Sequence, residues 1–100
     1  MNNLKMLLNK TGEPATLELL AEESAELAHA ALKLARVLRG ENPTPLTSGE
    51  ATVKLHAEIA DILSVIMVLM QADWFDSEFV DQCTDGKIKR WQTRMKVQDE

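Results

Sequence analysis

Residues 15–39, ATLELLAEESAELAHAALKLARVLR, decide the fold of this chain because they contain no helix breaker and are dense in Leu, Ala, Glu and Lys. These residue types have high intrinsic helix propensity. Pro14 suits the first turn of a helix, and Gly40 suits the position just past its end. The stretch therefore predicts one long helix. On a helical wheel its apolar residues share one arc, which contains Glu23 and has Glu26 at its edge; Glu18, Glu22, Lys33 and Arg36 fall on the far side.

The remaining sequence divides into further helices. The segment ENPTPLTSG, residues 41–49, contains two prolines and predicts a loop. Thr47 and Glu50 then have the spacing of a capping box, which predicts the start of a second long helix that runs to about Met70. The turn at residues 74–77, WFDS, contains an N-cap and predicts a third long helix that ends near Val97.

The overall fold class follows from this division. Residues 4–8 predict only a short additional helix, and no segment alternates apolar and polar residues as a strand does. We expect an all-α fold, a helical bundle of three long helices plus a short N-terminal helix, which is completed by dimerisation. At 100 residues the chain is expected to form a single domain over residues 1–100.

Composition excludes several classes of protein. Eleven Lys and Arg against sixteen Asp and Glu give a net charge of −5, which is unsuited to binding a nucleic acid backbone. The longest apolar stretch, residues 62–70, is too short to span a membrane, and no signal peptide is recognisable, so we expect no membrane partner and a cytoplasmic location. The one cysteine, Cys83, excludes an internal disulfide and a cysteine-based zinc site.

The second long helix predicts a partner subunit. Residues 57–70, AEIADILSVIMVLM, include only three polar side chains, those of Glu58, Asp61 and Ser64. A helix that is apolar nearly all round has to be surrounded by protein. The other helices of so short a chain cannot easily surround it, so we expect a homodimer or a dimer of dimers. An irregularly packed monomer is the alternative.

Four acidic residues fall on or beside these buried faces. Glu23 and Glu26 are three residues apart, as are Glu58 and Asp61, so each pair lies on one helical face. Burial of a carboxylate costs several kcal/mol unless it is compensated, and residues 55–86 contain no Lys or Arg. The carboxyls are therefore either protonated or hold a metal ion. Four converging oxygen ligands favour Mg²⁺, with Mn²⁺ as a possible substitute.

The same residues resemble a known family. The strings EESAE, residues 22–26, and EIAD, residues 58–61, are similar to the EExxE…ExxD signature of the MazG-like, all-α nucleoside triphosphate pyrophosphohydrolases, and the resemblance runs from about Leu17 to Arg94. It implies a fold of that type and Mg²⁺-dependent hydrolysis of a nucleoside triphosphate to the monophosphate and pyrophosphate. It also implies Mg²⁺ ligands and catalytic acids at particular positions. The metal ligands would be Glu23, Glu26, Glu58 and Asp61, and Glu22 or Glu26 would act as the base or orienter of the attacking water.

A basic segment of the third long helix extends this resemblance. Lys87, Arg90 and Arg94 share one helical face and are similar to the family's residues that contact the triphosphate tail of the substrate. The alternative is a solvated basic face that offsets the charge at the C-terminal end of a helix. Two departures from the family pattern are the long loop at residues 41–49, whose position over the site stays open, and Val65, where several members have Tyr.

Other functions fit parts of the pattern. Phosphoribosyl-ATP pyrophosphohydrolase belongs to the same superfamily and differs in its substrate. The step Glu26-Leu27-Ala28-His29 has the Glu-x-x-His spacing of di-iron carboxylate bundles, although the second helix has Asp61 where such a site needs His. A helical adaptor without catalysis would not need the four acids. The sequence does not indicate which base is preferred.

Overall fold

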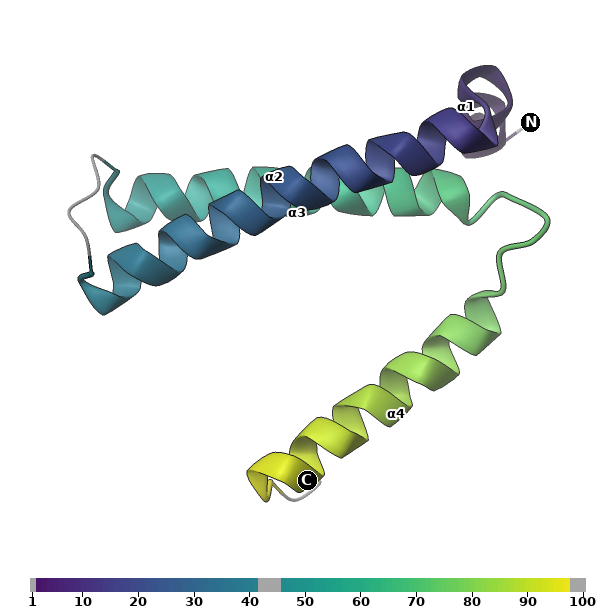
Figure 1. Cartoon of the computed structure of the whole chain (residues 1–100). Helices are drawn as coiled ribbons and strands as arrows, with labels where there is room; N and C mark the ends of the chain where they lie inside the picture. Colours follow the sequence, from purple (N-terminus) through teal and green to yellow (C-terminus); the bar gives the residue numbers. More distant parts are fainter. Residues whose placement is uncertain (1, 42–45, 98–100) are drawn as a thin grey trace.

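The computed structural model describes residues 2–41 and 46–97, and every regular element in these ranges is an α-helix. The elements are α1 (Asn3–Thr11), α2 (Glu13–Arg39), α3 (Ser48–Leu69) and α4 (Ser77–Met95), coloured in chain order in Figure 1. This confirms the predicted all-α class, with three long helices and one short N-terminal helix.

The helix ends are fixed by local capping chemistry. At the end of α2, Gly40 adopts the left-handed conformation with a φ of 69°, which a residue without a Cβ adopts at little cost. At the start of α3, the Thr47 hydroxyl accepts a hydrogen bond from the Glu50 N–H at 3.1 Å, and Glu50 Oε1 accepts one from the Thr47 N–H at 3.0 Å. The carboxylate of Asp76 accepts a hydrogen bond from an N–H in the first turn of α4. The predicted capping box and the predicted N-cap are both confirmed.

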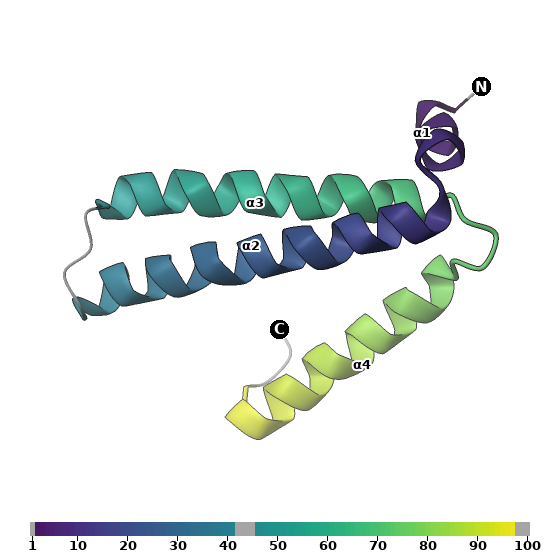
Figure 2. The same ribbon diagram turned by 45° about the horizontal axis from the view of Figure 1, so that its top comes forward.

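The helix α1 is longer than the sequence predicted. The side chain of Asn2 accepts a hydrogen bond from the Leu4 N–H at 2.8 Å and so sets the start of the helix ahead of the first leucine. Gly12 has a φ of 90° and turns the chain into α2. Figure 2 shows α1 lying across the end of the α2–α3 pair. The amine of Lys5 donates to the carbonyl of Gln71 at 3.0 Å, which fixes α1 to the end of α3.

The helices α2 and α3 form an antiparallel hairpin and lie side by side along their lengths (Figures 1 and 2). The buried apolar residues of the described chain are mostly small: Leu8, Ala30, Ala51, Leu69 and Ala72. Small side chains let the two helix backbones approach each other closely. Two polar residues, Thr16 and Glu58, are buried in the same layer. Glu58 lies in the middle of α3, where the candidate site is found.

The helix α4 stands apart from this hairpin. Among the described residues, no Cα of α4 lies within 8 Å of a Cα of α1, α2 or α3. Its large apolar residues Phe79, Ile88, Trp91 and Met95 are all exposed, and Trp91 is 64% exposed. The three long helices therefore do not form a bundle within one chain. The completion of the bundle by dimerisation stays a prediction.

The helix α3 also carries uncovered apolar side chains. Val53, Leu63 and Met67 are exposed on the hairpin surface. The uncovered apolar area on α3 agrees with the argument from the sequence for a partner subunit, and α4 adds a second uncovered face. Dimerisation stays a prediction. None of the helices in the described ranges has the length and the apolar character that crossing a bilayer requires.

Candidate metal centre

Four carboxylates converge at the middle of the α2–α3 hairpin. Glu23 and Glu26 come from α2, and Glu58 and Asp61 come from α3. One carboxylate oxygen from each residue lies within 4.8 Å of the corresponding oxygen of every other. The spacing of three residues places each pair on one face of its helix, and the side-by-side packing of the helices brings the two faces together. These are the four residues that the sequence predicted as metal ligands.

The four side chains differ in their burial. The Glu58 side chain is only 5% exposed, Glu23 is half-buried, and Glu26 and Asp61 are exposed. Within one chain, Glu58 lacks a solvated face, whereas Asp61 is exposed. The expected burial of Asp61 depends on a partner subunit and stays a prediction.

Two oxygens of the cluster are buried without a partner. Neither Glu23 Oε2 nor Glu58 Oε2 is accessible to solvent, and neither accepts a hydrogen bond from any described residue. A buried acceptor without a donor is costly, and the cost is larger for a charged group. A cation at the centre of the cluster would satisfy both atoms, so the residues present fit a bound metal ion.

The pKa of Glu23 also indicates that the cluster lacks compensating positive charge. Burial raises the pKa of Glu23 above its ordinary value of 4.5, and the charges of Glu26, Asp61 and Glu58 raise this pKa further. Like charges that face one another favour the protonated form of one of them. The described protein groups therefore do not neutralise this end of the cluster.

Among the described residues, the ion pair at the cluster joins two residues of α3. Lys54 Nζ lies 3.1 Å from Glu58 Oε1, one helical turn away. The pKa of Lys54 is raised first by the hydrogen bond to Glu58 and by the Glu58 charge, and then by the charges of Glu26 and Asp61. Lys54 falls just outside residues 55–86 and was not predicted as part of the cluster, although its spacing of four residues from Glu58 is a readable signal.

The converging ligands are all oxygens. Among the described residues the cluster contains no His and no Cys, and His29 lines an adjacent cavity without joining the four ligands. Oxygen ligands are typical of Mg²⁺ and Mn²⁺. The di-iron sites of helical bundles use His together with Glu. The all-oxygen set of ligands found here therefore favours Mg²⁺ or Mn²⁺ over a di-iron site.

A cavity of about 250 Å³ lies beside the cluster, between α2 and α3. Glu26 and Glu58 form part of its wall, and Lys33 and Lys54 form another part. The sequence prediction placed Lys33 on the far side of α2, and the structure corrects this. Lys33 follows Glu26 by seven residues, which is two helical turns, so both side chains lie on nearly the same face.

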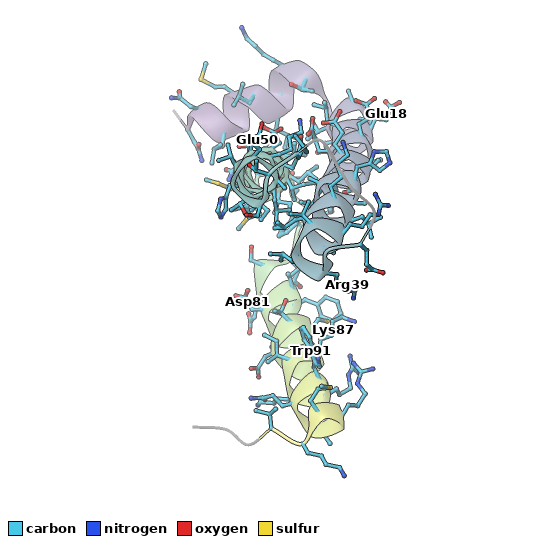
Figure 3. All side chains as sticks on the ribbon, turned by 90° about the vertical axis from the view of Figure 1, so that its left-hand side faces the viewer. Glu18, Arg39, Glu50, Asp81, Lys87 and Trp91 are labelled. Atoms are coloured by element: carbon cyan, nitrogen blue, oxygen red, sulfur yellow. The ribbon has the colours of Figure 1, made fainter. Side chains whose placement is uncertain are left out.

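The remaining predicted site residues are not in the cluster. Glu22 is exposed and is not one of the four converging acids. Lys87, Arg90 and Arg94 share a face of α4, as predicted, and line a shallow hollow on that helix, but they do not line the cavity beside the carboxylates. Figure 3 shows Lys87 on α4, below the α2–α3 layer. The sequence left open whether the loop at residues 41–49 covers the site. Residues 42–45 of this loop lie outside the described ranges.

Comparisons of this chain with protein-family models, with curated proteins and with solved structures find no match. The interpretation of the site therefore depends on its geometry and on the two acidic motifs.

Proposed function

We propose that the protein is a Mg²⁺-dependent nucleoside triphosphate pyrophosphohydrolase, which produces a nucleoside monophosphate and pyrophosphate. The observation that carries this proposal is the convergence of four carboxylates within 4.8 Å, two of them with buried oxygens that have no partner among the described residues. The resemblance of EESAE and EIAD to the motifs of the MazG-like enzymes supports the class of reaction.

The metal ligands in this proposal are Glu23, Glu26, Glu58 and Asp61. The mixture of buried and exposed acids suits Mg²⁺, which commonly retains several waters and binds through carboxylates and substrate phosphates. When bound, the ion supplies positive charge to the phosphate oxygens and makes a nearby water more acidic.

The acids at the open side of the cluster would handle the proton. Water attacks the α-phosphorus, the bond between that phosphorus and the bridging α–β oxygen breaks, and pyrophosphate leaves. Glu26 is exposed to solvent and adjoins the cavity, so its carboxylate can orient the water and accept its proton. Glu22 is the second candidate for this role because it lies one turn away on the same helix.

The proposed assembly is a homodimer or a dimer of dimers. The exposed apolar residues of α3 and α4 give a second copy a surface to cover. Lys87, Arg90 and Arg94 form a basic face on α4 that would contact the triphosphate tail in such an assembly. The exposed Trp91 lies on the same helix and suits the interface between copies.

The proposal is tested by incubating the protein and Mg²⁺ with a panel of common and modified nucleoside triphosphates and with phosphoribosyl-ATP. We expect equal amounts of monophosphate and pyrophosphate from at least one nucleoside triphosphate, and no product after addition of EDTA. Turnover of phosphoribosyl-ATP alone would favour the related activity. No pyrophosphate from any compound, or an iron chromophore in the purified protein, would contradict the proposal.

A further inference from the structure

We propose that Lys33 and Lys54 form a phosphate subsite beside the carboxylate cluster, which binds the polyphosphate portion of the ligand next to the metal ions. This inference rests on the proposed function and assigns two residues that neither acidic motif contains. It concerns the hairpin alone and is independent of where α4 lies.

Lys33 and Lys54 line two hollows beside the carboxylate cluster. Both line the cavity that Glu26 and Glu58 also line. Both also line a second, larger hollow of about 710 Å³, whose wall includes Val53 and residues at the N-terminal end of α3. The lysines thus stand between the acidic cluster and a space of the size that small-molecule ligands occupy.

Lys54 has hydrogen-bonding capacity beyond its ion pair with Glu58. An ammonium group has three N–H donors, and Glu58 Oε1 is the only acceptor that the described residues give to Lys54. The other oxygen of Glu58 is the buried, unpartnered one. Glu58 can therefore hold Lys54 through one oxygen and a metal ion through the other, and the ammonium keeps two donors for an anion beside that ion.

Lys33 lies on the facing helix and is not committed to an acid. Within the described part of the chain it forms no ion pair and donates no side-chain hydrogen bond, although Glu26 lines the same cavity. Four carboxylates repel an approaching polyphosphate, and two ammonium groups on the cavity wall offset this repulsion. A lysine ammonium is a common point contact for phosphate in proteins.

A purely structural role for Lys54, as the counter-ion of Glu58, makes a different prediction. Removal of the Lys54 charge would then change stability or metal affinity, without a separate effect on phosphate. Lys33 would have no effect at all. The two roles are distinguished by measuring metal binding and polyphosphate binding independently.

The experiment uses the full chain and two probes, Mn²⁺ alone and inorganic tripolyphosphate with saturating Mg²⁺, in isothermal titration calorimetry. The variants are Lys33→Met and Lys54→Met, with Lys54→Arg to retain the charge and Lys10→Met, on α1, as the matched control. We expect each Met variant to bind tripolyphosphate about tenfold more weakly, as the loss of a charge-assisted contact predicts. Lys54→Arg and Lys10→Met should stay close to the wild type, and Mn²⁺ affinity should not fall in any variant.

Two outcomes would overturn the subsite, and they are distinguishable. If Mn²⁺ binds normally and both Met variants bind tripolyphosphate as the wild type does, the subsite is wrong while the metal site stands. If the wild type binds no Mn²⁺, the proposed function fails and the subsite fails with it. Circular dichroism of each variant checks that the helices are retained, and Lys33→Met provides the test on an exposed residue if Lys54→Met unfolds.

Discussion

Lys54 and Glu58 lie one turn apart on α3, and their ion pair at 3.1 Å engages only one of the two carboxylate oxygens of Glu58. The other oxygen is buried and has no partner among the described residues. The protein therefore supplies part of the charge that the acidic cluster needs and leaves the rest unmet. A buried carboxylate oxygen without a partner distinguishes this cluster from an ordinary group of surface acids.

The substitutions Asp61→Asn and Glu58→Gln should each lower pyrophosphate release by at least about 100-fold, since even residues that only support a metal ligand contribute about 10–100-fold. Both replacements keep the shape of the side chain and remove its charge. The measurement is initial rate with saturating Mg²⁺, together with far-ultraviolet circular dichroism. Glu18→Gln, an exposed acid on α2 outside the cluster, is the matched control and should retain activity. Full activity in Asp61→Asn would remove that residue from the site.

The contribution of Glu23 to the stability of the metal-free protein should fall as pH rises above about 4.5. Burial, followed by the charges of the neighbouring acids, raises the pKa of Glu23, so the folded state binds its proton more tightly than the unfolded chain does. The stability contributed by this group is complete below the unfolded pKa and is lost as pH rises through the folded pKa.

Thermal unfolding in EDTA checks this linkage. We expect Glu23→Gln to have a higher Tm than the wild type at neutral pH without metal, and a weaker dependence of Tm on pH. Excess Mg²⁺ should raise the Tm of the wild type more than that of the variant. Identical pH profiles for the two proteins in EDTA would show that the Glu23 charge is not destabilising.

The capping box at the start of α3 should contribute measurably to stability. Thr47→Ala should lower the free energy of unfolding by about 1 kcal/mol, as loss of an N-cap typically does, whereas Thr47→Ser should retain most of it. Hydrogen bonds from the Thr47 backbone and side chain lower the pKa of Glu50. The contribution of the Glu50 carboxylate to stability is therefore present above pH 4.5 and is lost as pH falls through the folded pKa. Urea unfolding at neutral and acidic pH measures both effects. An unchanged urea midpoint in Thr47→Ala would contradict them.

The exposed apolar face of α4 should be covered in solution by a second copy. Ile88, Trp91 and Met95 are spaced so that they lie on one face of the helix, and all three are exposed in the single chain. Sedimentation should give at least twice the monomer mass, and Ile88→Asp should shift the protein toward monomer. Lys89→Asp, on the same helix at an exposed position, is the control. A wild-type monomer whose tryptophan fluorescence is readily quenched would contradict the assembly.

Most of the fold could be predicted because the signals that end helices are local. Gly40, the Thr47–Glu50 pair and Asp76 act on backbone groups within one turn, so their effects can be recognised from sequence spacing alone. The packing of α4 could not be predicted in this way. A helix with exposed apolar residues indicates that a surface must cover it, but the sequence pattern does not say whether that surface belongs to the same chain.

The candidate site was predictable to a similar extent. The spacing of three residues in each acidic pair fixed which carboxylates share a face, and the hairpin brings the two faces together. Lys54 was missed although its spacing of four residues from Glu58 is readable, because it falls just outside residues 55–86. Lys33 was missed because the helical wheel placed it on the far side of α2. Whether Lys33 points into the groove or away from it depends on how α2 and α3 are rotated against each other, which the wheel of a single helix does not contain.

The central claim is that Glu23, Glu26, Glu58 and Asp61 hold a divalent ion together. Titration of the metal-free protein with Mn²⁺, followed by the loss of the electron paramagnetic resonance signal of the free ion, tests it most directly. We predict saturable binding that Mg²⁺ competes away, that Glu23→Gln and Glu58→Gln each greatly weaken, and that Glu18→Gln leaves unchanged. Binding of equal strength in the wild type and the cluster variants, or no binding in the wild type, would contradict the claim.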